Sequence, residues 1–381
     1  MGTQTPSEIL EEVYRRAVES SNESFVVDEE TRERIDYVSR CVSNRSGVRS
    51  LLACALAKAH DPSVDVRRPY TDLGQNSYSG RTYDEQYVTP FINRYELPCT
   101  ITTAFLTPAF RAKNVALEPG VKLGGRPARL YENIILLLND VEEDHLNAEI
   151  LLTETVRNLI LLKQERQQRV LSLLSELETA GDEIPLSSED IVKLVQQHLS
   201  LPKASRLPVL VVAAAYQAAS QQLGERVLPL QSHTAADERT GALGDVEITL
   251  ASDDHIVTSY EMKMKRVTID DIDRALWKVT NASTRIDNYI FITTDLIDDD
   301  VTEYAKSLYA KTGGIEFAIL DCIGFLRHFL HLFHRLRIEF LEIYQDLVLN
   351  EPDNVVRQPL KEALLTLRQV AESSYAVEDE V

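Results

Sequence analysis

The sequence lacks several features that would mark a particular class of protein. Its four cysteines, Cys41, Cys54, Cys99 and Cys322, lie far apart without a Cys-x-x-Cys pair, which argues against a structural zinc site or a disulfide framework. No run reaches the roughly 18 apolar residues of a membrane helix, and the first residues are polar rather than signal-like. We therefore expect a cytoplasmic protein with reduced cysteines.

Three common catalytic motifs are also absent. The chain contains no His-Glu-x-x-His, no Gly-x-Ser-x-Gly and no phosphate-binding Gly-x-x-x-x-Gly-Lys sequence. These absences exclude the zinc-protease, hydrolase-elbow and P-loop interpretations.

Positive charge is scarce, because 40 basic residues stand against 60 acidic ones and give a net charge of −20. A nucleic-acid-binding protein is expected to show the opposite balance. One segment differs: residues 45–129 hold 12 basic and 7 acidic residues, a net of +5, although its loops 61–125 alone are neutral. The sequence thus places one basic segment in an acidic chain.

The 381 residues exceed one typical domain of roughly 100–200 residues, and the pattern changes along the chain. Helical periodicity dominates residues 1–200, including a long helix pair over 126–179 that is a candidate interface, although packing within one subunit explains its apolar stripes equally well. Residues 201–320 alternate helices with strands in the order αβββαβαβ, and 321–381 are helical again. We predict an α/β core with a mixed sheet, a mainly helical N-terminal domain and a helical C-terminal extension.

Acidic and basic side chains gather on two strands of this predicted sheet. Strands 244–251 and 255–264 form a hairpin around Ser252-Asp253-Asp254. Side chains alternate across a strand, so Asp245 shares a face with Glu247, and Glu261 shares one with Lys263. Two carboxylates that meet there require a divalent cation, and hard oxygen ligands suit Mg²⁺. An ion pair on a solvated strand face is the competing explanation for Glu261 and Lys263.

Gly244-Asp245 followed by Glu261-x-Lys263, within this order of elements, resembles the PD-(D/E)xK nuclease superfamily. The strings RRPYTDLGQNSYSGRTYDEQYVTPFI (67–92), TTAFLTPAFR (102–111) and PVLVVAAAYQAASQQLGERVLPLQSHTAADERTGALGDVEI (208–248) look like the SacI family of Type II restriction endonucleases. The resemblance implies a homodimeric, Mg²⁺-dependent enzyme that cuts double-stranded DNA at a short palindrome of the GAGCTC type. A methyltransferase that modifies the same site would be its partner in the cell.

The superfamily pattern makes Asp245 and Glu261 metal ligands, with the carbonyl of Met262 as a further ligand, and makes Lys263 the residue that positions the attacking water. Glu247 and Asp237 are additional acidic candidates, although Asp237 is explained equally by a turn. The helix before the first strand carries glutamines where many superfamily members have a glutamate, which leaves an anchor for a second metal in doubt.

Residues 1–200 are expected to recognise DNA and to dimerise, 201–320 to form the nuclease core and 321–381 to extend it. Arginine suits the guanine edge, and tyrosine suits phosphates. The candidate DNA-binding residues are Arg67, Arg68, Tyr78, Arg81, Tyr83 and Arg94. Two other functions stay open: a non-catalytic DNA-binding or interaction protein on a nuclease fold, and a nuclease for repair or for modified DNA.

Overall fold

A computed structural model describes residues 4–20, 23–100, 102–111, 114–179, 185–230, 242–253, 255–282 and 286–376. The chain divides into two compact units, residues 1–169 and 170–381. The division falls inside a helix, whereas the sequence analysis places the first boundary at residue 200.

The first unit is mainly helical, as predicted. Its opening helix begins where the sequence indicates, because Thr5 accepts a hydrogen bond from the N–H of Glu8 and the Glu8 carboxylate accepts one from the N–H of Thr5. The long helices are α1 (Pro6–Glu19), α2 (Glu29–Arg40), α3 (Ser46–His60), α6 (Ala128–Glu142) and α7 (Ala148–Thr179).

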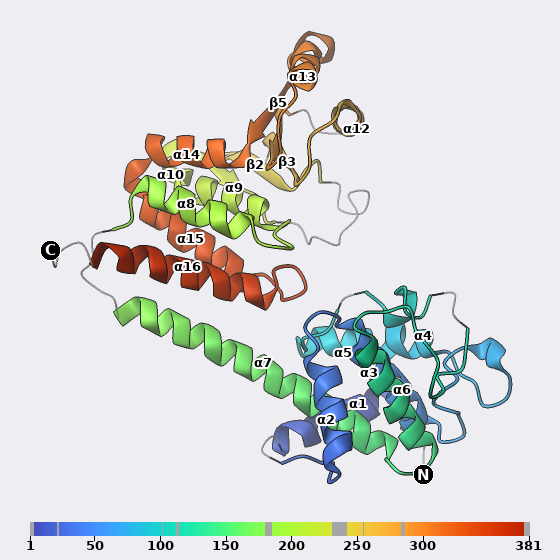
Figure 1. Ribbon diagram of the computed structural model, residues 1–381. Coiled ribbons are helices and arrows are strands. Elements are labelled where there is room, and N and C mark those ends of the chain that lie inside the picture. The colour runs from blue at the N-terminus through green and yellow to red at the C-terminus, as the bar shows by residue number, and fades with distance from the viewer. Residues whose placement is uncertain are drawn as a thin grey trace. The chain divides into compact units, whose positions relative to one another are not determined.

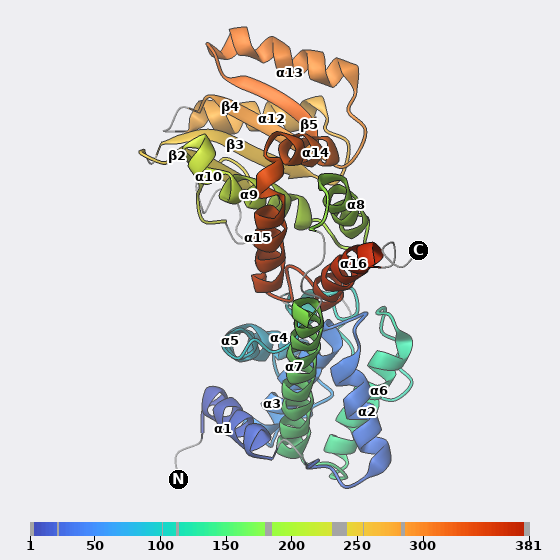
Figure 2. The same cartoon turned by 90° about the vertical axis from the view of Figure 1, so that its left-hand side faces the viewer.

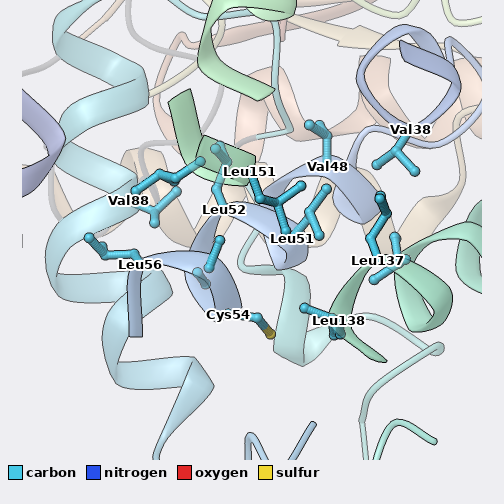
Figure 3. Close-up of a cluster of buried hydrophobic side chains, with 14 of the residues drawn as sticks. Val38, Val48, Leu51, Leu52, Cys54, Leu56, Val88, Leu137, Leu138 and Leu151 are labelled. Atoms are coloured by element: carbon cyan, nitrogen blue, oxygen red, sulfur yellow. The ribbon is translucent and has the colours of Figure 1, made fainter. Parts of the chain in front are cut away.

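Helix α3 forms the centre of this unit. Its residues from Ser46 to Ala57 are all buried, so the helix is covered on every side rather than along one stripe. Figure 3 shows aliphatic side chains of α3 packed against residues of α2, α6 and α7, including Val38, Leu137 and Leu151. This core supports the irregular segment that follows.

The segment 61–125 contains short helical turns and long connections. Its elements are η1 (Thr71–Leu73), α4 (Gly80–Tyr83), the π-helical turn η2 (Asp84–Val88), α5 (Thr89–Arg94) and η3 (Ala104–Leu106). A buried ion pair between Arg49 of α3 and Asp84 anchors it. The Arg49 guanidinium also donates to the carbonyl of Thr100, and the N–H of Ala104 donates to Asp84. Part of the basic charge in 45–129 is therefore buried and paired.

The second unit contains a five-stranded mixed sheet in the order β1-β2-β3-β4-β5. The predicted hairpin is confirmed: β2 (Val246–Leu250) pairs antiparallel with β3 (Ile256–Lys263). β4 (Asn288–Thr293) pairs in parallel with β3, so the sheet is mixed, as predicted. β1 (Glu225–Val227) lies antiparallel at one edge and β5 (Glu316–Asp321) parallel at the other.

Helices cover both faces of the sheet (Figures 1 and 2). On one face α12 (Ile269–Asn281) and α13 (Asp299–Thr312) pack over Tyr289, Phe291 and Phe317. On the other face α9 (Leu207–Ala218) and α14 (Cys322–Leu332) pack over Val246 and Tyr260. The other helices that the structure describes before the sheet, or between the sheet and the C-terminus, are α8 (Ser188–Leu199), α10 (Ser220–Leu223), η4 (His334–Leu336), α15 (Arg337–Asn350) and α16 (Gln358–Ala376).

The C-terminal helices are part of this core rather than an appended layer. Phe340 and Tyr344 of α15 are fully buried in the same cluster as α9 and as Val192 of α8. Helix α8 therefore belongs with the sheet, which explains why the boundary between the units precedes residue 200. The sequence does not reveal this, because each of these helices shows only its own apolar face.

The four cysteines are free thiols, with Cys54 and Cys322 buried. Across the described parts of the chain, no helix is both long enough and apolar enough to cross a membrane.

Candidate active site

The hairpin register brings Asp245 to the last residues of β3. Val246 lies opposite Tyr260, and the N–H of Asp245 donates to the carbonyl of Tyr260 over 2.7 Å. Oδ2 of Asp245 accepts a 2.8 Å hydrogen bond from the N–H of Met262. The aspartate carboxylate thus lies against the main chain of the residue between Glu261 and Lys263.

Glu261 and Lys263 form an ion pair, with 2.6 Å between the Lys263 ammonium and Oε1 of Glu261. The pair is not on a solvated strand face, because the Glu261 side chain is only 16% exposed. Both side chains lie on the face that α12 covers. The side chain of Met262 packs on the opposite face, so only its main chain can contribute here.

Helix α12 adds charged groups that surround this pair. Lys278 has its ammonium 3.7 Å from Oε2 of Glu261, and Asp271 lies 3.3 Å from the ammonium of Lys263. Arg274 pairs with Asp271 at 2.5 Å. The Thr268 cap fixes the start of this helix, since Thr268 and Asp271 bond each other's N–H groups. One cap therefore positions all three charges.

These neighbours shift two pKa values. Burial would lower the pKa of Lys263, but its ion pairs with Glu261 and Asp271 outweigh burial and raise it. Partial burial would raise the pKa of Asp271, but hydrogen bonds from Thr268 and the charge of Lys263 lower it to about 2. Lys263 is therefore a cation at neutral pH and can donate N–H hydrogen bonds.

Glu247 supports the entry to β2. Its Oε1 accepts a 2.7 Å hydrogen bond from the N–H of Leu243. Burial raises the pKa of Glu247, and the hydrogen bond from Leu243 opposes this shift. In this arrangement Glu247 holds the peptide that precedes Gly244-Asp245.

Tyr289 of β4 is a contact of the site that the sequence analysis missed. Its hydroxyl lies within hydrogen-bond distance of Oε2 of Glu261 and 3.0 Å from the carbonyl of Leu243. A signal was present in the parallel pairing of β3 with β4, which sets Tyr289 opposite Ser259 and on the face of Glu261. Sequence spacing alone does not fix that register.

The donor set fits a hard cation with several water ligands. Within the described ranges no three His, Cys, Asp or Glu side chains are grouped to hold a metal ion. Asp245 and Glu261 supply two carboxylates, and Mg²⁺ is commonly held by one or two carboxylates while it keeps water molecules. Asp237, the other acidic candidate, lies outside the described residues.

Four of the predicted DNA-binding residues are engaged within the first unit. Arg67 and Arg68 both pair with Asp65, at 3.0 and 3.2 Å. Tyr78 is buried, and its hydroxyl donates to the carbonyl of Val66. Tyr83 lies 2.7 Å from a ring nitrogen of His60. These contacts stabilise the irregular segment, and the buried hydroxyl of Tyr78 has no access to a phosphate.

Arg81 and Arg94 are the exposed members of that set, with ion pairs to Glu85 and Glu11 on the surface. They lie at the two ends of the continuous helical run α4-η2-α5, whose outer side also exposes Gln86 and Asn93. Glutamine and asparagine read adenine edges as arginine reads guanine. The sequence analysis does not name these two residues, because it considers only arginine and tyrosine in this segment.

The second unit is thus an α/β fold with a mixed sheet. Carboxylates and lysines cluster where β2 begins and β3 ends. No known protein-family model matches this chain, and no curated protein is similar to it at a significant level.

Proposed function

We propose that this chain is a Mg²⁺-dependent Type II restriction endonuclease with a PD-(D/E)xK active site. The observation that supports it most is the hydrogen bond from the N–H of Met262 to Asp245. It joins an aspartate to the middle of a Glu-x-Lys triplet on the neighbouring strand, and the superfamily pattern combines an aspartate with such a triplet.

In this proposal Asp245 and Glu261 hold Mg²⁺, with the carbonyl of Met262 as a further oxygen ligand. A bound Mg²⁺ supplies a Lewis acid for the phosphoryl oxygen and lowers the pKa of a bound water. The half-buried position of Glu261 keeps bulk water from competing for its charge.

Lys263 orients the attacking water and offsets negative charge on the phosphate. Its raised pKa keeps it protonated, so it donates hydrogen bonds rather than removing a proton. The water oxygen bonds to phosphorus, the bond from phosphorus to one sugar oxygen breaks, and that oxygen leaves with a proton. One phosphodiester and one water thus give a phosphate monoester and a hydroxyl.

DNA recognition in this proposal belongs to the first unit, at the outer side of α4-η2-α5. The exposed side chains Arg81, Gln86, Asn93 and Arg94 can hydrogen-bond base edges in the major groove. The buried ion pair between Arg49 of α3 and Asp84 of η2 holds this helical run against α3.

The test is cleavage of unmethylated phage DNA by the purified protein with Mg²⁺, followed by mapping of the ends. Discrete fragments are expected from the wild type, and no cleavage from Asp245→Asn, Glu261→Gln or Lys263→Met, all of which should still bind DNA. Asp253→Asn in the turn of the hairpin and Lys265→Met just after β3, both exposed, are the matched controls and should cleave normally.

Each other result points to a different function. A smear of fragments, or cleavage confined to modified DNA, would favour a repair or modified-DNA nuclease. DNA binding without cleavage under any metal would favour a non-catalytic protein on a nuclease fold. Normal cleavage by Glu261→Gln would remove the active-site assignment itself.

A further inference from the structure

Tyr289 connects the two segments that carry the acidic residues of the site. The residue is fully buried on β4, and its ring packs against Phe291 and Phe317 with ring centroids 5.3 and 5.6 Å away. Its hydroxyl meets Oε2 of Glu261 on β3 and the carbonyl of Leu243, two residues before Asp245. One buried phenol therefore touches both arms of the hairpin.

The Leu243 peptide is held on both of its polar groups. Its N–H donates to Glu247 over 2.7 Å, and its carbonyl lies 3.0 Å from the hydroxyl of Tyr289. The chain then passes through Gly244 directly to Asp245. A fixed Leu243 peptide limits how far the Asp245 carboxylate can move from Glu261.

We infer that Tyr289 is a positioning residue that sets the spacing of the Asp245 and Glu261 carboxylates for a divalent cation. The inference rests on the proposed function, because it concerns the same metal site. The packing of the ring would be met equally by phenylalanine, whereas a hydroxyl in a fully buried position needs polar partners. Both of the partners shown here belong to the site.

The hydroxyl carries one proton, and both of the contacts described above are with acceptor oxygens. When Oε2 of Glu261 turns to a cation, the hydroxyl of Tyr289 can donate its hydrogen bond to the carbonyl of Leu243. This makes Tyr289 compatible with both the ion-paired and the metal-binding arrangement of Glu261.

The experiment compares Tyr289→Phe with Tyr344→Phe in the full-length protein. Tyr344 is equally buried in the same unit, and its hydroxyl lies 2.9 Å from a ring nitrogen of His198, away from the site. Both variants lose one buried hydroxyl, so their melting temperatures should fall similarly. Circular dichroism checks that each remains folded.

Two readouts separate a positioning role from a purely structural one. Calorimetric titration with MgCl₂ in the absence of DNA gives the Mg²⁺ affinity, and cleavage against Mg²⁺ concentration gives the metal requirement. Tyr289→Phe is expected to weaken Mg²⁺ binding and to raise the Mg²⁺ requirement about tenfold, as for other residues that orient metal ligands. Tyr344→Phe should leave both unchanged.

The outcomes are distinguishable. The inference is overturned, and the proposed function stays intact, if the wild type binds Mg²⁺ and cleaves DNA while Tyr289→Phe has the same Mg²⁺ affinity and the same Mg²⁺ requirement. A wild-type protein that neither binds Mg²⁺ nor cleaves DNA would overturn both. If Tyr289→Phe and Tyr344→Phe weaken Mg²⁺ binding equally, Tyr289 only stabilises the fold and the inference is overturned.

Discussion

Gly244 packs against the carbonyl oxygen of Tyr260 so closely that a Cβ atom at Gly244 would lie 2.5 Å from that oxygen. The same Cβ would lie 2.5 Å from the hydroxyl oxygen of Ser259. The backbone at residue 244 thus approaches β3 without room for a side chain, and this approach brings Asp245 to Met262.

We expect Gly244→Ala to separate the two strands where the site lies. Because the clash involves a strand carbonyl that cannot rotate away, the free energy of unfolding should fall by about 1–3 kcal/mol. Cleavage and Mg²⁺ binding should fall further than stability alone explains, since Asp245 moves with residue 244. Urea unfolding and calorimetric Mg²⁺ titration measure the two effects.

Gly124→Ala is the control for this substitution. A Cβ at Gly124 meets only the carbonyl of Pro108 at 3.4 Å, which is an ordinary contact. It should leave stability and cleavage near wild type. Unchanged Mg²⁺ binding in Gly244→Ala would show that the close approach does not set the position of Asp245.

The sequence predicts the frame of the site well, because the relevant signals are local. Thr268 and Asp271 form a capping box within four residues, and α12 begins there in the structure. The hairpin of β2 and β3 follows from two alternating strands around a short turn. Asp245 directly precedes β2, and Glu261 and Lys263 lie on β3, so the same local signals predict where all three residues lie.

The remaining contacts depend on pairings between distant segments, which spacing does not encode. Tyr289 reaches Glu261 only because β4 pairs with β3 in one register, and a shift by one residue would turn the ring to the other face. Arg49 counts as one of the basic residues of 45–129, yet its charge is buried and paired with Asp84. Net charge of a segment therefore overstated its exposed positive surface.

Replacing both exposed arginines of the helical run, Arg81→Ala with Arg94→Ala, should relax the recognition site. A residue that reads a guanine contributes about 1–3 kcal/mol of discrimination. Gln86→Ala and Asn93→Ala should likewise weaken the discrimination between bases at any adenine that these side chains read. Cleavage rates on a set of duplexes with single base changes measure the loss.

Arg335→Ala, which changes a basic residue in the other unit, serves as the control and should keep the wild-type preference. Unchanged discrimination in the variants of all four exposed residues would place recognition elsewhere in the chain.

A histidine in the second unit should make its stability depend on pH. His198 is buried, with Nε2 donating to the carbonyl of Leu360 and Nδ1 accepting from the hydroxyl of Tyr344, each over 2.9 Å. Burial lowers the pKa of His198 from 6.5 to about 4. The unfolded chain therefore takes up a proton at a higher pH than the folded chain does.

The stability from neutral His198 is present above pH 6.5 and is lost as the pH falls towards 4. The full loss amounts to about 3 kcal/mol, at about 1.4 kcal/mol per pKa unit. Urea unfolding at several pH values, compared between the wild type and His198→Gln, isolates this contribution. Equal pH slopes in the two proteins between pH 6.5 and 4 would contradict it.

The last prediction concerns the assembly that meets the DNA. A net charge of −20 per chain repels phosphates, so sequence-independent binding, which is almost wholly electrostatic, should be weak. Specific contacts must then supply most of the affinity. A palindrome offers each set of base edges twice, related by a two-fold axis.

A two-fold symmetric homodimer matches that symmetry, because it presents two recognition surfaces and one set of Asp245, Glu261 and Lys263 to each strand. Sedimentation of the protein with and without a site-containing duplex should therefore give a complex of two chains per duplex, and both strands should be cut in one binding event. The long helices of 126–179 are the first segment to test for the interface, with the exposed Leu171 on α7 changed to glutamate. A complex of one chain per duplex that nicks a single strand would contradict the dimer, since one active site cannot reach two symmetry-related phosphates at once.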